Sequence, residues 1–112
     1  MPLIRPVTEN DLPQVHAMVC HLARHHGDTA QLTLDDLARD APGAHPWLSV
    51  LVAEAAQGLS GYAALCPLAQ LQFGVRGMDL HHLYIRDNMR GQGVGRALVD
   101  ACIGVAQARG CR

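Results

Sequence analysis

Apolar residues recur along the chain at two different spacings, and the change from one spacing to the other predicts its secondary structure. Residues 3–7 form a short apolar run between prolines, which predicts an opening strand. Thr8 and the acidic residues that follow it indicate a helix start, with Thr8 capping exposed N–H groups. Gly27 indicates the end of this helix. Between them, apolar residues recur at spacings of three and four: Leu12, Val15, Val19 and Leu22.

A second helix signal begins at Thr33, and Pro42-Gly43 ends it. After His45-Pro46, residues 47–55 are rich in β-branched and apolar side chains and predict a strand. Residues 59–71 follow a turn at Gln57-Gly58 and predict its antiparallel partner. Pro67 cannot donate a ladder hydrogen bond and therefore indicates a bulge or the end of regular pairing in that strand.

The last third of the chain predicts one more strand and one more helix. Residues 74–77 predict a turn and residues 78–86 a third sheet strand. Residues 94–109 predict a helix that Gly110 ends. Its apolar side is formed by Leu98, Cys102, Val105 and Ala106.

The predicted order is β-α-α-β-β-β-α, within a single domain that spans residues 1–112. This order is typical of an α/β (α+β mixed) fold, with a central mixed, mostly antiparallel sheet flanked by helices. Repeats, low-complexity tracts and linkers are absent from the sequence. The apolar strand at residues 78–86 is expected near a sheet edge, which another element would have to cover.

Composition and charge narrow the function classes. The 112 residues carry a formal net charge of -1, and all nine basic residues are arginine, which argues against general binding to a nucleic-acid backbone. The chain has neither a run of about 18 apolar residues nor a secretory signal at its start, so we expect a soluble, cytoplasmic protein without a membrane partner.

Neither the cysteines nor the histidines form a metal-binding pattern. The four cysteines include no C-x-x-C pair and are expected to be free thiols, buried or partly buried, in a reducing compartment. His21 and His25 would share one helix face, with His16 upstream, but no H-E-x-x-H or nearby ligand set accompanies them. We therefore expect no metal cofactor.

Three glycines between the last strand and the last helix form the most informative pattern: Gly91, Gly93 and Gly95. Glycine allows close backbone approach, and the free N–H groups of a helix N-terminus favour an anion. Arg90 and Arg96 add positive charge at both ends of this turn, which suits a pyrophosphate. A turn that needs glycine for geometry alone is the alternative.

Two familiar phosphate-binding motifs do not fit this turn. A nucleoside-triphosphate P-loop requires a lysine, and the chain contains none. The dinucleotide motif requires G-x-G-x-x-G, whereas these glycines are spaced two and two.

The segment L-Y-I-R-D-N-M-R-G-Q-G-V-G-R-A-L, residues 83–98, resembles the acetyl-CoA-binding motif of the GNAT superfamily, whose common form is R-G-x-G-x-G. Upstream segments, among them Leu51-Val52-Ala53-Glu54 and Gly61-Tyr62-Ala63, are similar to the diamine (spermidine/spermine-like) N-acetyltransferase branch. The resemblance covers nearly the whole chain. It implies a GNAT-like fold that lacks its C-terminal strands and helix, and a homodimer.

The resemblance also implies the cofactor site. Backbone groups of Leu83 and Ile85 would pair with the pantetheine arm, and an N–H near Leu83 or Tyr84, at a bulge in residues 78–86, would polarise the thioester carbonyl. The pyrophosphate would lie on the turn formed by Arg90, Gly91, Gln92, Gly93, Val94, Gly95 and Arg96.

The implied activity is N-acetyl transfer from acetyl-CoA, as co-substrate, to a primary amine of a small molecule or peptide, by direct attack in a ternary complex. A non-catalytic acyl-CoA-binding or regulatory domain, and an interaction domain with a merely structural turn, are the alternatives. The Leu-Glu-Asp triplet of the diamine branch reads Leu80-His81-His82 here, which disfavours a polyamine acceptor. His81 is the candidate proton relay. Since adjacent strand residues face opposite sides, at most one of the two histidines is expected to face the substrate. Tyr62 and Tyr84 are expected to be packing residues, and the family's tyrosine acid would lie beyond Arg112.

Overall fold

The computed structural model describes residues 3–111 and contains four strands and three α-helices within them. The elements, in chain order, are β1 (Leu3–Pro6), α1 (Leu12–His25), α2 (Leu34–Asp40), β2 (Ser49–Ala55), β3 (Gly58–Gln70), β4 (Val75–Ile85) and α3 (Val94–Ala108). The strands pair in the order β1-β2-β3-β4, each antiparallel to its neighbour. The predicted fold class and element order are therefore confirmed.

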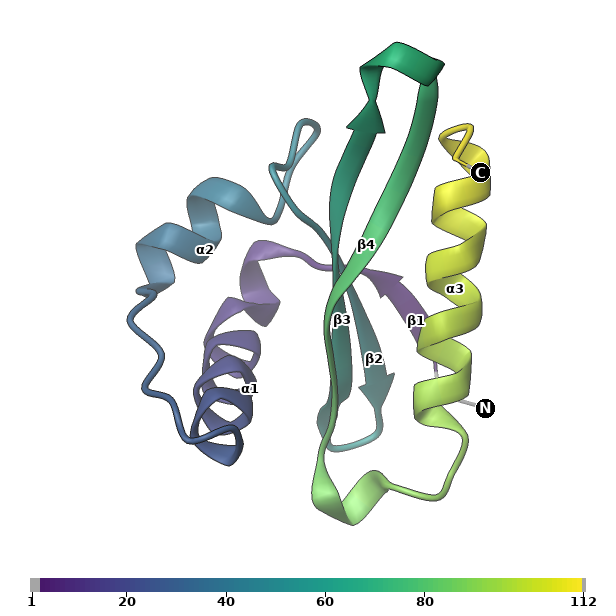
Figure 1. Cartoon of the computed structure of the whole chain (residues 1–112). Helices are drawn as coiled ribbons and strands as arrows, with labels where there is room; N and C mark the ends of the chain where they lie inside the picture. The colour runs from purple at the N-terminus through teal and green to yellow at the C-terminus, as the bar shows by residue number, and fades with distance from the viewer. Residues whose placement is uncertain (1–2, 112) are drawn as a thin grey trace.

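The sheet separates two helical layers (Figure 1). Helices α1 and α2 lie against one face, where α1 buries Leu12, Val15 and Met18. Helix α3 covers the other face and buries Val94, Leu98 and Cys102. Each helix follows the apolar spacing seen in its sequence, because only one stripe of a surface helix can be buried against a sheet.

Two apolar cores result, one on each face of the sheet. The α1 face is filled by the larger cluster, which includes Val52, Tyr62 and Tyr84 from three neighbouring strands. The α3 face is filled by a second cluster, which includes Leu51, Ala63 and Leu65. Strands β2 and β3 contribute to both clusters through alternate residues, as expected of strands covered on both faces.

The prediction for Pro67 was wrong in part, since β3 continues three residues past it. Pro67 pairs with Met78, while the partner strand β2 reaches only to Leu65. A proline is tolerated there because this part of β3 has a neighbouring strand on one side only. The resulting β3–β4 hairpin extends beyond the rest of the sheet (Figure 1).

Two other strand boundaries differ from the predictions. The turn between β3 and β4 is formed by a 3₁₀ turn at Leu71–Phe73 and by Gly74, so Gly77 lies within β4. Strand β2 begins at Ser49, and the side chain of Trp47 is 78% exposed. The apolar character of Trp47 extended the predicted strand beyond the residues that pair.

A bidentate ion pair connects β1 to the start of α1. The Arg5 guanidinium donates to both carboxylate oxygens of Asp11, at 2.7 and 2.9 Å, and lies 3.4 Å from Glu54 on β2. Asp11 also accepts from the N–H and the hydroxyl of Thr8, at 2.8 and 3.0 Å. Thr8 is the N-cap residue of the 3₁₀ turn Glu9–Asp11 that leads into α1, as the sequence predicted, and it forms a capping box with Asp11. Hydrogen bonds from Arg5 hold the pKa of buried Asp11 at about 2.

Replacing Asp11 with Asn should lower the free energy of unfolding at pH 7 by about 2 kcal/mol, because charge-assisted hydrogen bonds are lost at a buried position. The pKa of Asp11 is depressed in the folded state, so its contribution is present above the usual value of 3.8 and is lost as the pH falls through about 2. Urea unfolding of the wild-type chain and of Asp11→Asn, at pH 7 and near pH 2, measures this difference in the free energy of unfolding. Asp79→Asn, on the exposed part of β4, is the control, and an equal loss there would contradict the assignment.

Candidate functional site

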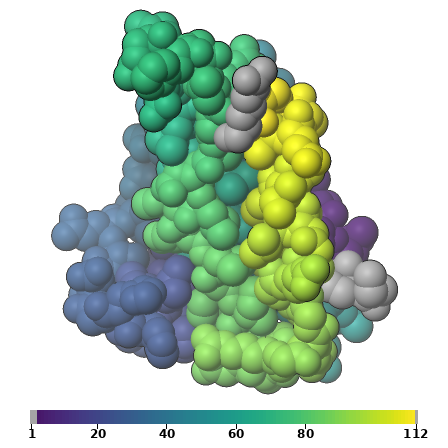
Figure 2. Space-filling view, turned by 45° about the vertical axis from the view of Figure 1, so that its right-hand side comes forward, coloured from purple at the N-terminus to yellow at the C-terminus, as the bar shows by residue number. Residues whose placement is uncertain are grey.

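Strand β4 is one of the two outer strands of the sheet, and among residues 3–111 no other strand pairs with the second half of its edge away from β3. The Arg86 N–H donates to Ser60 O at 2.8 Å, which places the Arg86 and Tyr84 backbone groups toward β3. Because backbone groups alternate along a strand, those of Leu83 and Ile85 point to the opposite side. The Arg90 Nε lies 3.4 Å from Ile85 O on that side. Figure 2 shows β4 at the molecular surface between α1 and α3.

The first part of the same edge contacts the C-terminal end of α3. Cys111 forms a single parallel bridge with Arg76, and the Arg76 guanidinium donates to Arg109 O at 3.0 Å. These contacts bring the C-terminal end of α3 against the start of β4. The free part of the edge is therefore the part that leads to the glycine-rich turn.

The turn after β4 presents the start of α3 without a side-chain cap. Gly91 and Gly93 adopt positive φ values of 80° and 81°, and α3 begins directly after Gly93. Gly93 supplies no side-chain acceptor for the first N–H groups of the helix. Gly95 lies against the Ile85 side chain, since a Cβ there would be 3.8 Å from the Ile85 methyl. Buried Val94 anchors the turn to the core. Free N–H groups at the start of a helix suit an anion.

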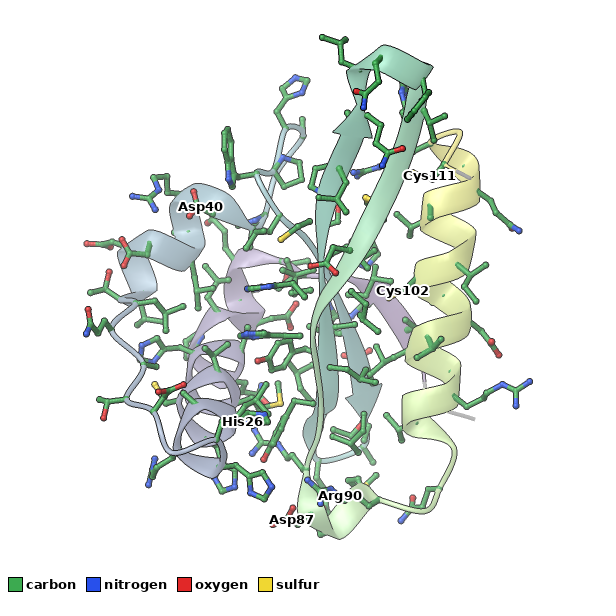
Figure 3. The ribbon with its side chains drawn as sticks, in the orientation of Figure 1. His26, Asp40, Asp87, Arg90, Cys102 and Cys111 are labelled. Carbon is green, nitrogen blue, oxygen red and sulfur yellow. The ribbon has the colours of Figure 1, made fainter. Side chains whose placement is uncertain are left out.

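Both arginines of the turn pair with carboxylates on their own segment. Arg90 lies 3.3 Å from Asp87 and Arg96 lies 3.5 Å from Asp100, and all four side chains are more than half exposed. Figure 3 shows Asp87 and Arg90 together in the loop beyond β4. Exposed pairs of this kind contribute little to stability, so either arginine can exchange its partner for a bound anion at small cost.

A β-bulge in β4 brings two histidines together. His82 pairs with Ala64 on β3, but Leu80 pairs with the next residue, Leu65, so His81 is an extra residue in β4. The two imidazoles are stacked, with centroids 4.4 Å apart and an interplanar angle of 9°. The prediction that they face opposite sides was wrong, because a bulge interrupts the alternation of side chains.

Tyr62 on β3 holds one of these rings. Its hydroxyl lies 3.2 Å from His82 Nδ1, and the Tyr62 side chain is 1% exposed. Burial raises the pKa of the Tyr62 phenol well above its usual range. Burial also lowers the pKa of His82, and the neighbouring His81 and His26 lower it further. Tyr62 was predicted to be a packing residue, and it both packs and contacts His82.

The histidine pair lines a cavity of about 320 Å³ between β4 and the end of α1. The cavity is lined by Leu22, Ala23, His26, Asp28, His81, His82 and Leu83. Leu83 therefore belongs both to this cavity and to the free edge of β4. Figure 3 labels His26 at the end of α1.

The position of Asp28 in this cavity is set by the end of α1. The Gly27 N–H donates to Arg24 O and the Asp28 N–H donates to Ala23 O, a Schellman ending in which Gly27 has a φ of 79°. The sequence predicts Gly27 as the helix stop. It does not identify Asp28 and His26 as cavity residues, because only the packing of α1 against the sheet brings them near β4.

Three further findings concern metal ligands, cysteines and membrane spans in the described residues. Within residues 3–111, no three His, Cys, Asp or Glu side chains come together as a metal-ligand set. The four cysteines are free thiols, with Cys102 buried and the others half-buried. Over the same residues, no helix is long and apolar enough to cross a membrane.

Residues 14–112 match the acetyltransferase (GNAT) family. No curated protein matches the sequence.

Solved acetyltransferase structures have a similar fold. An aminoglycoside acetyltransferase from an uncultured soil metagenomic sample, in complex with sisomicin, has 18% identity over 99% of this chain and 73% of that chain, with a TM-score of 0.80. The ribosomal-protein-alanine N-acetyltransferase of Brucella melitensis biovar Abortus 2308 has 20% identity over 99% and 76%, with a TM-score of 0.80. An integron cassette protein from the mobile metagenome of Cole Harbour Salt Marsh has 20% identity over 97% and 72%, with a TM-score of 0.81. These similarities establish the fold.

The position of the β4 edge depends on Gly61, where a Cβ would lie 2.5 Å from Tyr84 O. Gly61→Ala should lower the free energy of unfolding by about 1–3 kcal/mol, because β3 and β4 must separate to admit the methyl group. Gly104→Ala, on the exposed side of α3 with no atom within 4 Å, should instead stabilise the protein by about 0.5–1 kcal/mol. Thermal or urea unfolding measures both changes. Equal effects of the two substitutions would contradict the close approach at Gly61.

Proposed function

The chain belongs to the acetyltransferase (GNAT) family, and we propose that it transfers the acetyl group of acetyl-CoA to a primary amine by direct attack in a ternary complex. The observation that carries this proposal is the position of Leu83, at the junction of two features. Its backbone faces the edge of β4 away from β3, and Leu83 is also one of the residues that line the cavity beside the histidine pair. A thioester on that edge and an amine in that cavity would meet at one residue.

The cofactor is proposed to lie along β4 and on the turn. The pantetheine arm would pair with Leu83 and Ile85 as an added strand does, and Tyr84 would support this edge from the core. The pyrophosphate would lie on residues 90–96, with N–H groups at the start of α3 as donors. Of the two donors proposed for the thioester carbonyl, Leu83 is favoured, because the Tyr84 backbone faces β3.

The acceptor is proposed to enter the 320 Å³ cavity as a primary amine of a small molecule or a peptide. Two structural neighbours suggest the first compounds to test, since one is an aminoglycoside acetyltransferase and another acetylates a ribosomal protein at alanine. His81, predicted from the sequence as a proton relay, lies in the wall of this cavity. A cytoplasmic location and a homodimer remain predictions from the sequence.

Calorimetric titration with acetyl-CoA tests the cofactor site, and we expect binding below millimolar concentration. Gly93→Leu should weaken it at least tenfold, because the new side chain covers the anion-binding turn. Gly110→Leu is a matched control at the other end of α3, since Gly110 has a φ of 77° against 81° for Gly93. Both variants should lose about 1–2 kcal/mol of stability from the strained backbone. Equal coenzyme affinity in the two variants would contradict the assignment.

Release of free coenzyme A distinguishes an enzyme from a non-catalytic acyl-CoA-binding domain. The wild-type chain is incubated with acetyl-CoA and either sisomicin, an alanyl peptide or no acceptor, and the thiol is measured. If the chain transfers the acetyl group, at least one acceptor should raise the rate of thiol release well above the rate without acceptor. A chain that binds acetyl-CoA and releases no thiol with any primary amine would be a binding domain instead.

A further inference from the structure

The two stacked histidines differ in how firmly they are held. His81 is exposed at the bulge, whereas His82 is half-buried and has Tyr62 at 3.2 Å from its Nδ1. The Tyr62 ring is itself fixed, since its side chain is fully buried in the α1-side core and its ring centroid lies 6.1 Å from that of Tyr84. A proton-transfer group works best when its ring is held in one orientation.

We propose that His82 is the catalytic residue that accepts the proton of the attacking amine, and that Tyr62 is the positioning residue that holds its ring. This inference rests on the acetyl transfer proposed above and assigns the proton to His82 in place of His81. This role requires the tautomer in which His82 Nδ1–H donates to the Tyr62 hydroxyl oxygen, 3.2 Å away, because the lone pair is then on Nε2 and can take a proton.

The step is balanced within this site and its substrates. The amine nitrogen forms a bond to the thioester carbonyl carbon, and the C–S bond breaks with its electron pair on sulfur. The proton released by the nitrogen passes to His82 Nε2, directly or through one water molecule. The imidazolium then gives that proton to the coenzyme A thiolate, which regenerates neutral His82 and leaves an amide and free coenzyme A.

The surroundings of His82 keep it ready to accept a proton at neutral pH. Burial lowers its pKa from 6.5, and the stacked His81 and nearby His26 act in the same direction, so the neutral form predominates at pH 7. Asp28 is the one carboxylate among the residues that line the same cavity, and it lies in the loop after α1. On β3, the phenol of Tyr62 is neutral because burial raises its pKa.

Two further titratable groups affect the pKa of Tyr62 but not that of His82. Cys20 on α1 and Tyr84 on β4 both raise the pKa of Tyr62. Neither lines the cavity. On the acid side of the pH profile, activity is therefore expected to fall as His82 becomes protonated. The pH of that fall also depends on the three other titratable residues that line the cavity: His26, Asp28 and His81.

The experiment compares four variants with the acceptor that releases coenzyme A in the assay above. His82→Gln keeps polar contacts but cannot carry the proton, so kcat should fall about 100-fold or more while acetyl-CoA affinity changes less than about twofold. Tyr62→Phe retains the packed ring and should lower kcat about fivefold, with the acid limb of the pH profile moved to lower pH because the imidazolium loses its acceptor. His81→Ala should move that limb to higher pH. His45→Ala, in the exposed loop after α2, is the control that changes neither.

Nuclear magnetic resonance titration of the imidazole signals gives a second readout that needs no acceptor. The His82 signal should titrate below pH 6.5 and shift in Tyr62→Phe, and the spectra also show whether each variant is folded. A folded His82→Gln variant with full kcat, or a 100-fold loss in His81→Ala alone, would overturn this inference while leaving acetyl transfer intact. A wild-type chain that releases no coenzyme A with any amine would overturn the proposed function and this inference with it.

Discussion

The pairing of β3 with β4 determines nearly everything that concerns the candidate site. The two strands approach closely at Gly61, where a side chain would collide with the Tyr84 carbonyl. This pairing directs the Tyr84 and Arg86 backbone groups inward and leaves those of Leu83 and Ile85 at the outer edge. A single extra residue in β4 then turns His81 and His82 to the same side. The free edge and the histidine pair are thus two consequences of one strand register.

The helices complete the site from opposite faces of the sheet. Helix α3 brings its uncapped N-terminus to the end of β4, because Val94 and Leu98 are buried in the core on that face. Helix α1 ends on the other face in a Schellman motif that places Asp28 beside the bulge. The sheet therefore separates the proposed cofactor turn from the acceptor cavity, and Leu83 on its edge is common to the two regions.

Charge contributes to this arrangement locally rather than through the whole molecule. The chain has a formal net charge of -1, and the two arginines of the turn are already paired with carboxylates. Recognition of an anion would therefore depend mainly on the backbone N–H groups at the start of α3, whose positions the fold determines. The histidine cavity follows the same principle, because burial and close neighbours lower the pKa of His82.

The sequence alone determined the order of the elements, the apolar stripes of α1 and α3, and the glycine turn, since local spacing and glycine chemistry specify these features. It also pointed to the family that residues 14–112 match. The tertiary structure decided where the strand alternation breaks. The family resemblance implied a bulge within residues 78–86, but only the pairing of β3 with β4 places it at His81 and turns His81 and His82 to the same side. The same applies to Tyr62 and Asp28, which meet the histidines only when β3 pairs with β4 and α1 packs against the sheet.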